Sequence, residues 1–440
     1  MDFAAFADRA HDIEAASADT EITERVNDLL VAAGSDLPII VRFLQGQVFP
    51  AHDSRTLDIG PALCYEAIAR AAGHNVTAAD VETRLADRGE IGAVAASYDL
   101  GGQQGLNAFT DGAEDGLTVA EVDADLRELA AAEGAGSQDT KTDQLFGLFN
   151  RASATEARYL ARLVLGEMRI GVGGGTVRDA IAEAFDVSVE AVERALQVTN
   201  DYGLVAEVAR EDGEDGLEGL HLEVGRPVQA MLAQTGTVTG ALEDWGQAAV
   251  EVKYDGARVQ VHYDGQQARL FSRNMEEVTD ALPEVVAFVE RELEVPAILD
   301  GEVIAIDDDG ELLPFQDVLR RFRRKHDIEK AREDVAVRLR AFDCLHVGSD
   351  GGTDLLDVPL TSRRERLETL LSTGVSEWWL AEDSEAIAQI EAETLEAGHE
   401  GIMLKDPESA YTPGRRGKRW RKRKPDVETL DLVVTAAEWG

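Results

Sequence analysis

The first half of the chain carries its apolar residues at helical spacing. Up to about residue 208, apolar side chains recur every three or four positions, as in TEARYLARLVLGEM at 155–168, and this period is typical of helices with one buried face. Just before that segment, Ser153 and Glu156 have the spacing of a capping box. The pattern predicts an all-α domain over residues 1–208.

The second half of the chain alternates apolar and polar positions instead. Residues 250–274 contain two Asp-Gly pairs, at 255–256 and 264–265, flanked by segments of period two, which is typical of β-hairpins. Further strands are expected at 298–306, 337–345 and 400–405, with helical stretches at 275–294, 315–333, 361–373 and 384–397. The pattern predicts an α+β domain built on antiparallel sheet, which we place at residues 224–428.

Three segments interrupt these two patterns. Residues 209–223 show no apolar period, and their central EDGEDGLEG holds five acids and three glycines, so we expect an acidic linker. The stretch GVGGGT at 171–176 fits neither the dinucleotide fingerprint nor the lysine-ending phosphate loop, which favours a helix-breaking turn over a phosphate site. The strand pattern at 430–436 has no later segment with which to pair, so we expect a further domain that has been cut away.

Charge is the unusual feature of the composition. The chain has 43 Lys and Arg against 85 Asp and Glu, a net charge of −42, and only eight of the basic residues are lysines. An acidic surface poor in lysine is typical of proteins from salt-saturated cytoplasm. Because the Debye length is about 3 Å at 1 M salt, this charge does not exclude DNA as a partner. Any DNA contact must rest on local basic clusters.

Cysteine usage and the N-terminus exclude several protein classes. Cys64 and Cys344 are far apart and form no CxxC motif, which argues against zinc ribbons and disulfide scaffolds and favours two core residues. The first residues are acidic rather than basic, and no stretch approaches 18 apolar residues, so we expect neither a signal peptide nor a membrane span. The sequence predicts a cytoplasmic protein.

Lys253 is the candidate nucleophile. It directly precedes the first Asp-Gly pair, and Glu251 lies two residues earlier on the same face of the predicted strand. In a chain with eight lysines this placement is informative, although a surface lysine on a hairpin is the alternative when the segment is taken alone. A lysine amine becomes nucleophilic when its pKa is lowered.

Six segments follow one another in a recognisable order: EVKYDGAR (251–258), FSRN (271–274), LDGEVI (299–304), AFDCLH (341–346), EGIMLK (400–405) and RRGKRWRKRK (415–424). Together they resemble the nucleotidyltransferase motifs of ATP-dependent DNA ligases. The helical half, with residues 150–185 and 225–234, resembles the DNA-binding domain of the archaeal and eukaryotic type. The resemblance covers essentially the whole chain, and the acidic composition is haloarchaeal in character.

The resemblance implies a reaction through a lysyl-AMP intermediate. Lys253 would attack the α-phosphate of ATP and release pyrophosphate, AMP would pass to the 5′-phosphate at a nick, and the 3′-hydroxyl would displace it. Glu251 would offer its backbone to adenine, Phe342 would stack on the purine, and Glu302 would accept from a ribose hydroxyl. For Phe342, a core aromatic is the alternative that the residues leave open.

Phosphate and metal contacts are implied for further residues. Arg258 and Arg273 would grip phosphate or the nick, and Glu400, assisted by Glu302, would hold Mg²⁺. Asp255 is expected either to contact DNA or a metal, or simply to form its turn.

The segment 415–424 has eight basic residues in ten. Period two places Trp420, Lys422 and Lys424 on one face of a strand, and Arg419, Arg421 and Arg423 on the other. One face is expected to serve the nucleotide and the other the DNA backbone. The resemblance assigns nucleotide phosphate contacts to Arg416, Lys422 and Lys424.

A second basic cluster, RRFRRKH at 320–326, is interpreted as a phosphate-backbone contact, with a structural arginine network as the alternative.

The family carries a C-terminal OB-fold that would begin at about residue 429, so residues 429–440 are expected to be the start of a truncated OB-fold. We expect ATP and Mg²⁺ as cofactors, nicked duplex DNA as substrate, a sliding clamp as a candidate partner, no membrane contact and a monomer. The alternatives are an RNA ligase or an mRNA capping-type nucleotidyltransferase, and a nick-binding protein without catalysis. The long helical domain argues against the first two, and the lack of zinc-ligand cysteines argues against an NAD-dependent ligase.

Overall fold

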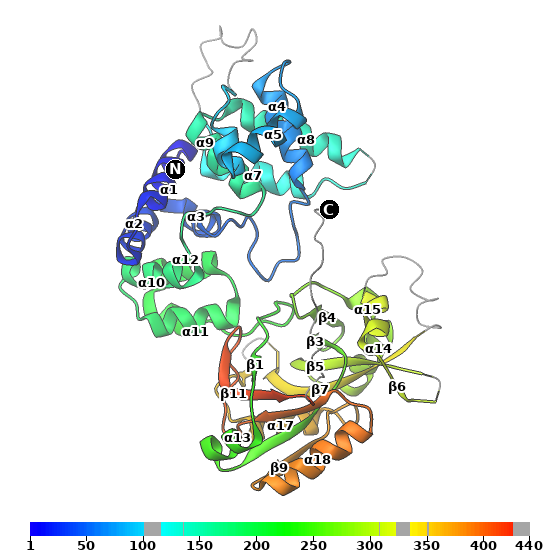
Figure 1. Ribbon diagram of the computed structural model, residues 1–440. Coiled ribbons are helices and arrows are strands. Elements are labelled where there is room, and N and C mark those ends of the chain that lie inside the picture. Colours follow the sequence, from blue (N-terminus) through cyan, green and yellow to red (C-terminus); the bar gives the residue numbers. More distant parts are fainter. Residues whose placement is uncertain (101–115, 135, 308, 323–334, 350–351, 426–440) are drawn as a thin grey trace, which may run out of the picture. The chain divides into compact units, whose positions relative to one another are not determined.

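The computed structural model describes residues 1–100, 116–134, 136–307, 309–322, 335–349 and 352–425 (Figure 1). The chain divides into two compact units, Met1–Val228 and Gln229–Gly440. The predicted OB-fold start at 429–440 lies outside the described residues. Within the described part, no helix is long and apolar enough to cross a membrane.

The first unit is helical, as predicted. Its α-helices are α1 (Phe3–Ala15), α2 (Asp19–Ala32), α3 (Leu37–Leu44), α4 (Pro61–Ala72), α5 (Ala78–Arg88), α6 (Ile91–Ala95), α7 (Val119–Ala130), α8 (Ser137–Arg151), α9 (Ala154–Val164), α10 (Gly174–Phe185), α11 (Val189–Thr199) and α12 (Tyr202–Glu218). The predicted capping box is present at α9, where the Ser153 and Glu156 side chains satisfy each other's backbone N–H groups. The glycine-rich stretch leads into α10, whose N-cap is Gly173.

The segment predicted as an acidic linker is mostly helix. Helix α12 continues to Glu218, interrupted only at Gly213, whose φ of 64° lies in the left-handed region. This segment is helical because Ala209 and Leu217 are buried in the core of the first unit. The acidic, glycine-rich composition does not show that these two residues are buried. Burial of these apolar residues outweighs the weak helix propensity of the three glycines.

The second unit contains two β-sheets. The five-stranded sheet has the order β1-β11-β10-β2-β9, and the six-stranded sheet has the order β4-β3-β5-β7-β8 with β6 on β5. All pairs are antiparallel except β1 with β11. The strands are β1 (Leu232–Thr235), β2 (Ala248–Lys253), β3 (Ala257–Tyr263), β4 (Ala268–Ser272), β5 (Ala297–Ile306), β6 (Leu312–Leu313), β7 (Ala336–Val347), β8 (Thr353–Asp354), β9 (Trp378–Ala381), β10 (Gly401–Lys405) and β11 (Arg416–Arg423).

Helices cover one face of each sheet (Figure 1). They are α13 (Val238–Trp245), α14 (Pro283–Glu292), α15 (Phe315–Phe322), α17 (Leu360–Leu370) and α18 (Ser384–Glu396). One apolar core joins the six-stranded sheet to α14 and α17, and a second joins the five-stranded sheet to α13 and α18. Both cysteines are buried, as expected.

The first Asp-Gly pair does not form the hairpin that the sequence predicts. Strands β2 and β3 belong to different sheets, so the chain crosses from one sheet to the other at Asp255-Gly256. Glycine is needed there because a Cβ atom at position 256 would lie 2.4 Å from the carbonyl oxygen of Val303. The second pair does connect a hairpin, in which the N–H of Asp264 donates to the carbonyl of Gln267 at 3.2 Å.

Candidate active site

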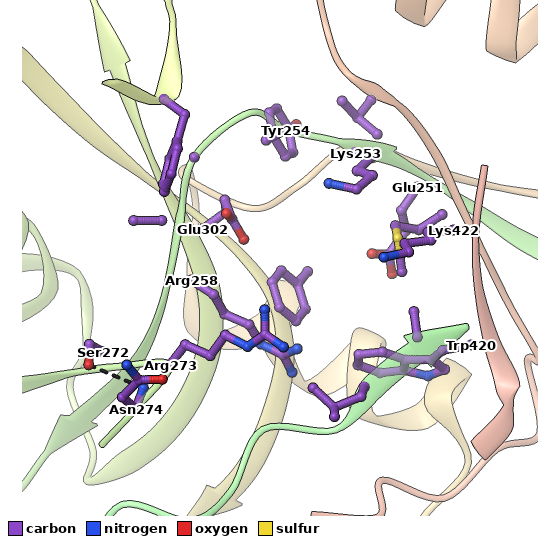
Figure 2. A pocket seen from close by; sticks show the side chains of 18 of the residues that line it. Glu251, Lys253, Tyr254, Arg258, Ser272, Arg273, Asn274, Glu302, Trp420 and Lys422 are labelled. Carbon is purple, nitrogen blue, oxygen red and sulfur yellow. Dashed lines mark hydrogen bonds between the residues drawn. The ribbon is translucent and has the colours of Figure 1, made fainter. Parts of the chain in front are cut away.

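A cavity of about 550 Å³ opens where the two sheets meet (Figure 2). Strands β2 and β11 line it from the five-stranded sheet, and β5, β7 and helix α15 line it from the other side. It brings together eight residues that the sequence singles out: Glu251, Lys253, Arg258, Arg273, Glu302, Phe342, Arg416 and Lys422. The other two, Glu400 and Lys424, are reached through Lys253, because the Glu400 carboxylate contacts the amines of both lysines.

Lys253 is the last residue of β2, and its side chain extends into the space that Glu302 also faces (Figure 2). Its side chain is 21 % exposed and its Nζ contacts a carboxylate oxygen of Glu400. Burial lowers the pKa of Lys253, although the carboxylates of Glu302 and Asp255 oppose this shift. A lowered pKa increases the fraction of free amine, the nucleophilic form.

Glu302 lies on β5, directly across from Arg258 on β3. Burial raises the pKa of Glu302 to about 7, and the nearby charges of Arg258 and Lys253 only partly counteract it. Among the residues that the structure describes, no hydrogen bond or ion pair satisfies its carboxylate. Glu302 is half-buried, and a carboxylate that loses part of its hydration without gaining a partner is destabilised, so this site fits a ligand that supplies a hydroxyl or a cation.

The donor set fits Mg²⁺ bound jointly by protein and substrate. Glu302 and Glu400 both supply carboxylate oxygens close to Lys253. Within the described ranges, no group of three or more His, Cys, Asp or Glu side chains could hold a metal by itself. Mg²⁺ commonly uses one or two carboxylates together with substrate phosphates, which agrees with a two-carboxylate arrangement.

The far wall of the cavity holds a buried ion pair that the sequence did not reveal. Lys405 Nζ lies 2.7 Å from Glu251 Oε2, and both residues are nearly fully buried. The amine also lies 4.5 Å from the ring centroid of Phe342 and 4.1 Å from that of Trp420. Glu251 Oε1 and Trp420 Nε1 are buried and have no hydrogen-bond partner in the part of the chain that the structure describes. The signal for Lys405 was present, because a rare lysine ends an otherwise apolar strand.

Arg258 is largely occupied by the protein. Its guanidinium donates to both carboxylate oxygens of Asp300, at 3.0 and 2.6 Å, to the carbonyl of Met231 at 2.6 Å and to Tyr411 Oη at 3.2 Å. Asp300 is fully buried, and a buried charge needs a counter-charge. Four of the five N–H donors are therefore in use, which leaves one for the phosphate grip that the sequence predicts.

The two faces of β11 alternate as predicted, but the outer face differs from the expected DNA surface. Arg419 pairs with Asp406, Arg421 with Asp244, and Arg423 with Glu391. Each outer arginine is thus neutralised within the chain. The basic residues that line the cavity differ from these arginines. Arg416 and Lys422 on β11, and Arg273 just after β4, have no ion-pair partner among the described residues.

The described residues of the basic cluster at 320–326 form ion pairs within the chain, which is the structural arginine network given as the alternative to a phosphate contact. Arg321 is buried and donates to the Glu284 carboxylate at 2.6 and 2.8 Å, and Arg320 pairs with Asp317 at 2.6 Å. Residues 323–326 lie outside the described ranges. The predicted phosphate contact is therefore wrong for Arg321. Asp255 also has a structural role, since its carboxylate accepts from the N–H of Phe315, the first residue of α15, at 3.1 Å.

A matched pair of substitutions on β11 should separate its two faces. Lys422→Met removes an unpaired cation from the cavity, so we expect the ATP concentration for half-maximal AMP loading to rise about tenfold, the scale of one charge-assisted hydrogen bond. Arg421→Met removes a side chain that packs 4.5 Å from the ring of Trp245. We expect it to lower the free energy of unfolding by about 1 kcal/mol and to leave ATP half-saturation unchanged. If Arg421→Met raised the ATP concentration for half-saturation and Lys422→Met affected only stability, the two-face arrangement would be wrong.

Comparisons with known proteins agree over both units. The family model described as "ATP dependent DNA ligase domain" matches residues 230–424, and the one described as "DNA ligase N terminus" matches residues 2–182. Three similar curated proteins, each named DNA ligase, come from Haloarcula marismortui (72 % identical), Haloferax volcanii (62 %) and Methanococcoides burtonii (42 %). Each match spans the whole chain and 79–80 % of the relative. The solved structure named Pmar-Lig_Pre shares the fold, with a TM-score of 0.58 at 15 % identity over 96 % of this chain and 78 % of that one.

Proposed function

Because this chain belongs to the ATP-dependent DNA ligases, we propose that Lys253 is the residue that takes AMP from ATP, in a cavity that binds the nucleotide. The activity itself is the ATP-dependent joining of nicked DNA, with a divalent metal that is normally Mg²⁺. The roles of individual residues in this reaction are proposed from the geometry of the cavity.

One observation carries the choice of nucleophile. Three lysines among the described residues line the cavity, Lys253, Lys405 and Lys422. Lys405 is almost fully buried and paired with Glu251, whereas Lys253 is partly exposed to the cavity and lies near Glu302. An amine locked against a buried carboxylate cannot approach phosphorus, and a partly exposed amine with a lowered pKa can. Lys253 therefore meets both requirements of a nucleophile, access and a free electron pair.

The first step forms a bond from Lys253 Nζ to the α-phosphorus of ATP and breaks the bond to the β-phosphate oxygen. Pyrophosphate leaves with that electron pair, and the amine, which attacks as the free base, releases one N–H proton to solvent. Glu400 contacts Nζ and is positioned to orient the amine, while Arg416 and Lys422 supply unpaired positive charge for the phosphates. Bound Mg²⁺ would stabilise negative charge on the phosphate oxygens, held by Glu302 and Glu400.

The next two steps move AMP onward. An oxygen of the 5′-phosphate at the nick attacks the phosphorus of lysyl-AMP, and the bond to Nζ breaks, which restores the lysine. The 3′-hydroxyl then attacks the 5′-phosphorus and expels AMP. Splitting the reaction in this way turns a poor leaving group on the nick into a good one.

We assign the base of ATP to the aromatic end of the cavity. Phe342 and Trp420 supply flat apolar surface there. Glu251 Oε1 and Trp420 Nε1 are a buried acceptor and a buried donor that have no partner among the described residues. A purine offers a face for stacking and edge groups for hydrogen bonds. The Glu251 side chain, beyond the backbone role expected from the sequence, is thus a candidate contact to the exocyclic amine.

The experiment that tests the nucleophile is a mass spectrum of the chain after incubation with ATP and Mg²⁺ in concentrated KCl. We expect a gain of one AMP, which peptide mapping places on Lys253. An adduct on Lys405, Lys422 or Lys424 would overturn the assignment, and the absence of any adduct would remove the proposed first step from this chain.

Replacing Phe342 by leucine should weaken ATP binding by roughly 1 to 3 kcal/mol, the scale of stacking a base on an aromatic ring. The melting temperature should change little, because Phe342 is half-buried and lines the cavity. Half-saturation for AMP loading and a thermal melt measure the two quantities on one variant. A core aromatic would give the opposite result, with a large fall in melting temperature and unchanged ATP affinity.

We further propose that the helical domain, residues 1–208, is the part that binds duplex DNA around the nick, with residues 224–428 as the adenylation domain. The match of residues 2–182 to the ligase N-terminal family supports this division. Action as a monomer and binding to a sliding clamp stay predictions, which analytical ultracentrifugation of the chain with and without the clamp would test.

A further inference from the structure

Phe342 lies at an irregular point of strand β7. Along the pairing of β7 with β5, Ala341 is opposite Gly301 and Asp343 is opposite Asp300, so Phe342 has no partner on β5. One extra residue of this kind is a β-bulge, a feature that redirects side chains and is common beside active sites. Ala341 joins the apolar core, and Phe342, the next residue, lines the nucleotide cavity.

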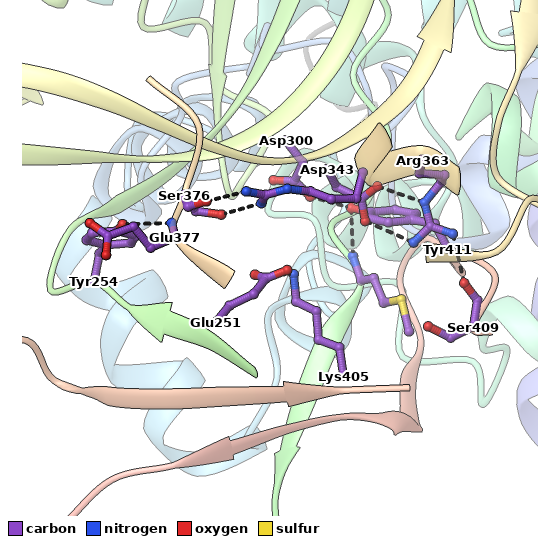
Figure 3. A network of polar contacts seen from close by, with 12 residues as sticks. Glu251, Tyr254, Asp300, Asp343, Arg363, Ser376, Glu377, Lys405, Ser409 and Tyr411 are labelled. Carbon is purple, nitrogen blue, oxygen red and sulfur yellow. Dashed lines mark hydrogen bonds and ion pairs between the residues drawn. The ribbon is translucent and has the colours of Figure 1, made fainter. Parts of the chain in front are cut away.

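Asp343, the residue after the bulge, is held by the guanidinium of Arg363 on helix α17. Arg363 Nε and Nη2 donate to the two carboxylate oxygens of Asp343 at 2.7 and 3.0 Å, and both side chains are fully buried. The remaining Arg363 nitrogen donates to the carbonyl of Ser409 at 2.8 Å. Figure 3 shows this pair within its network of polar contacts.

The residue before the bulge is held by the next arginine of the same helix. Ala341 makes two backbone hydrogen bonds of 2.8 Å to a neighbouring segment, one with Gly374 and one with Ser376. Arg364 Nη1 donates to the hydroxyl of Ser376 at 2.8 Å, and its Nη2 contacts the carbonyl oxygen of Ser376. Arg364 and Ser376 are both nearly fully buried.

We infer that Arg363 and Arg364 are positioning residues that hold this bulge and thereby aim Phe342 at the base of the nucleotide. The inference rests on the stacking role proposed for Phe342. A strand has a side-chain period of two, so loss of the extra residue from the pairing would move Phe342 off its face. Two consecutive arginines fix the backbone on both sides of that residue. Neither arginine lines the cavity, so neither contacts the nucleotide, and the bulge that they hold connects them to Phe342.

The test replaces the buried pair without leaving a charge behind. Removing one partner would strand a buried charge, whereas exchanging both for apolar residues of similar size is often neutral for stability. The variant Asp343→Leu/Arg363→Met should therefore stay folded and should require about tenfold more ATP for half-maximal AMP loading, with little change in the rate at saturation. Tenfold lies within the range of about 5- to 150-fold expected for complete loss of stacking.

A second variant keeps the test decisive if the double exchange does not fold. Arg363→Lys keeps the charge but loses the planar fork, and half-saturation should rise about threefold. The same changes are then made in Phe342→Leu, where they should add nothing, because the ring that they position is gone. Additive effects in that background, or no effect in the parent, would overturn the inference.

A matched control uses Arg162, which is buried in the helical unit and paired with Glu14 and Glu90 at 2.9 and 3.0 Å. Arg162→Met should lower the melting temperature and leave ATP half-saturation unchanged. The single Phe342→Leu variant separates the two proposals. If it leaves half-saturation unchanged, the stacking role is wrong; if it raises half-saturation while the Arg363 variants do not, only the positioning role is wrong.

Discussion

Replacing Lys253 by arginine is expected to abolish AMP transfer completely while the fold and DNA binding survive. The positive charge is kept, and so is the contact that Glu400 makes with it. A guanidinium stays protonated at every accessible pH and its electron pair is delocalised, so it cannot attack phosphorus. The measurement is the mass of the chain after incubation with ATP and Mg²⁺, together with a gel-shift assay on nicked duplex.

A lysine elsewhere in the same domain provides the control for this exchange. Lys418 lies on β11 and does not line the cavity, so Lys418→Arg should load AMP at the parent rate. Adduct formation by the Lys253→Arg variant would show that another residue is the nucleophile. Loss of loading in both variants would indicate a general effect of the substitution rather than a lost nucleophile.

The structure gathers most of the residues that the motifs single out around one cavity, because most of them stand on or beside strands with clear local patterns. Arg258 on β3 and Glu302 on β5, for example, lie directly opposite each other in the sheet. Motif order along the chain therefore becomes proximity in the fold. The helical and α+β halves followed equally from periodicity, since periods of 3.6 and 2 are local properties.

Long-range pairing decided the features that the sequence could not reveal. The dipeptide Asp255-Gly256 has the composition of a hairpin turn, but β3 pairs with β5 and β2 pairs with β10, so the two strands diverge. Local composition cannot specify which distant strand completes a sheet. Glycine is needed at position 256 for another reason, because the backbone of Val303 lies too close to leave room for a Cβ atom.

The arginines illustrate the same limit. Arg421 and Asp244 are far apart in the sequence but paired in the fold, and Arg258 is matched to the buried Asp300. In a chain with so many carboxylates, most basic residues find an acidic partner. Basic residues that lack one, such as Arg416 and Lys422, are therefore the informative ones, and only the structure distinguishes them.

The charged form of Glu302 lowers the free energy of unfolding. Its pKa in the folded chain is about 7, above its ordinary value of 4.5, because burial disfavours the charged form. The folded state thus binds this proton more tightly than the unfolded state, and stability falls as pH rises from about 4.5 to 7. Above about pH 7 the full cost of the buried charge is present.

We therefore expect Glu302→Gln to stabilise the fold in the absence of nucleotide and metal, although it removes a residue assigned to the active site. The gain should be up to about 3 kcal/mol at about pH 8, since each pKa unit corresponds to 1.36 kcal/mol, and should vanish below about pH 4.5. Urea unfolding at constant high KCl, at about pH 8 and about pH 5, measures the difference. Glu276→Gln, at an exposed position on the cavity rim, serves as the control and should change stability by less than about 0.5 kcal/mol at both pH values. An equal gain for Glu302→Gln at both pH values would mean that the buried charge is not what destabilises the site, because a neutral packing effect does not depend on pH.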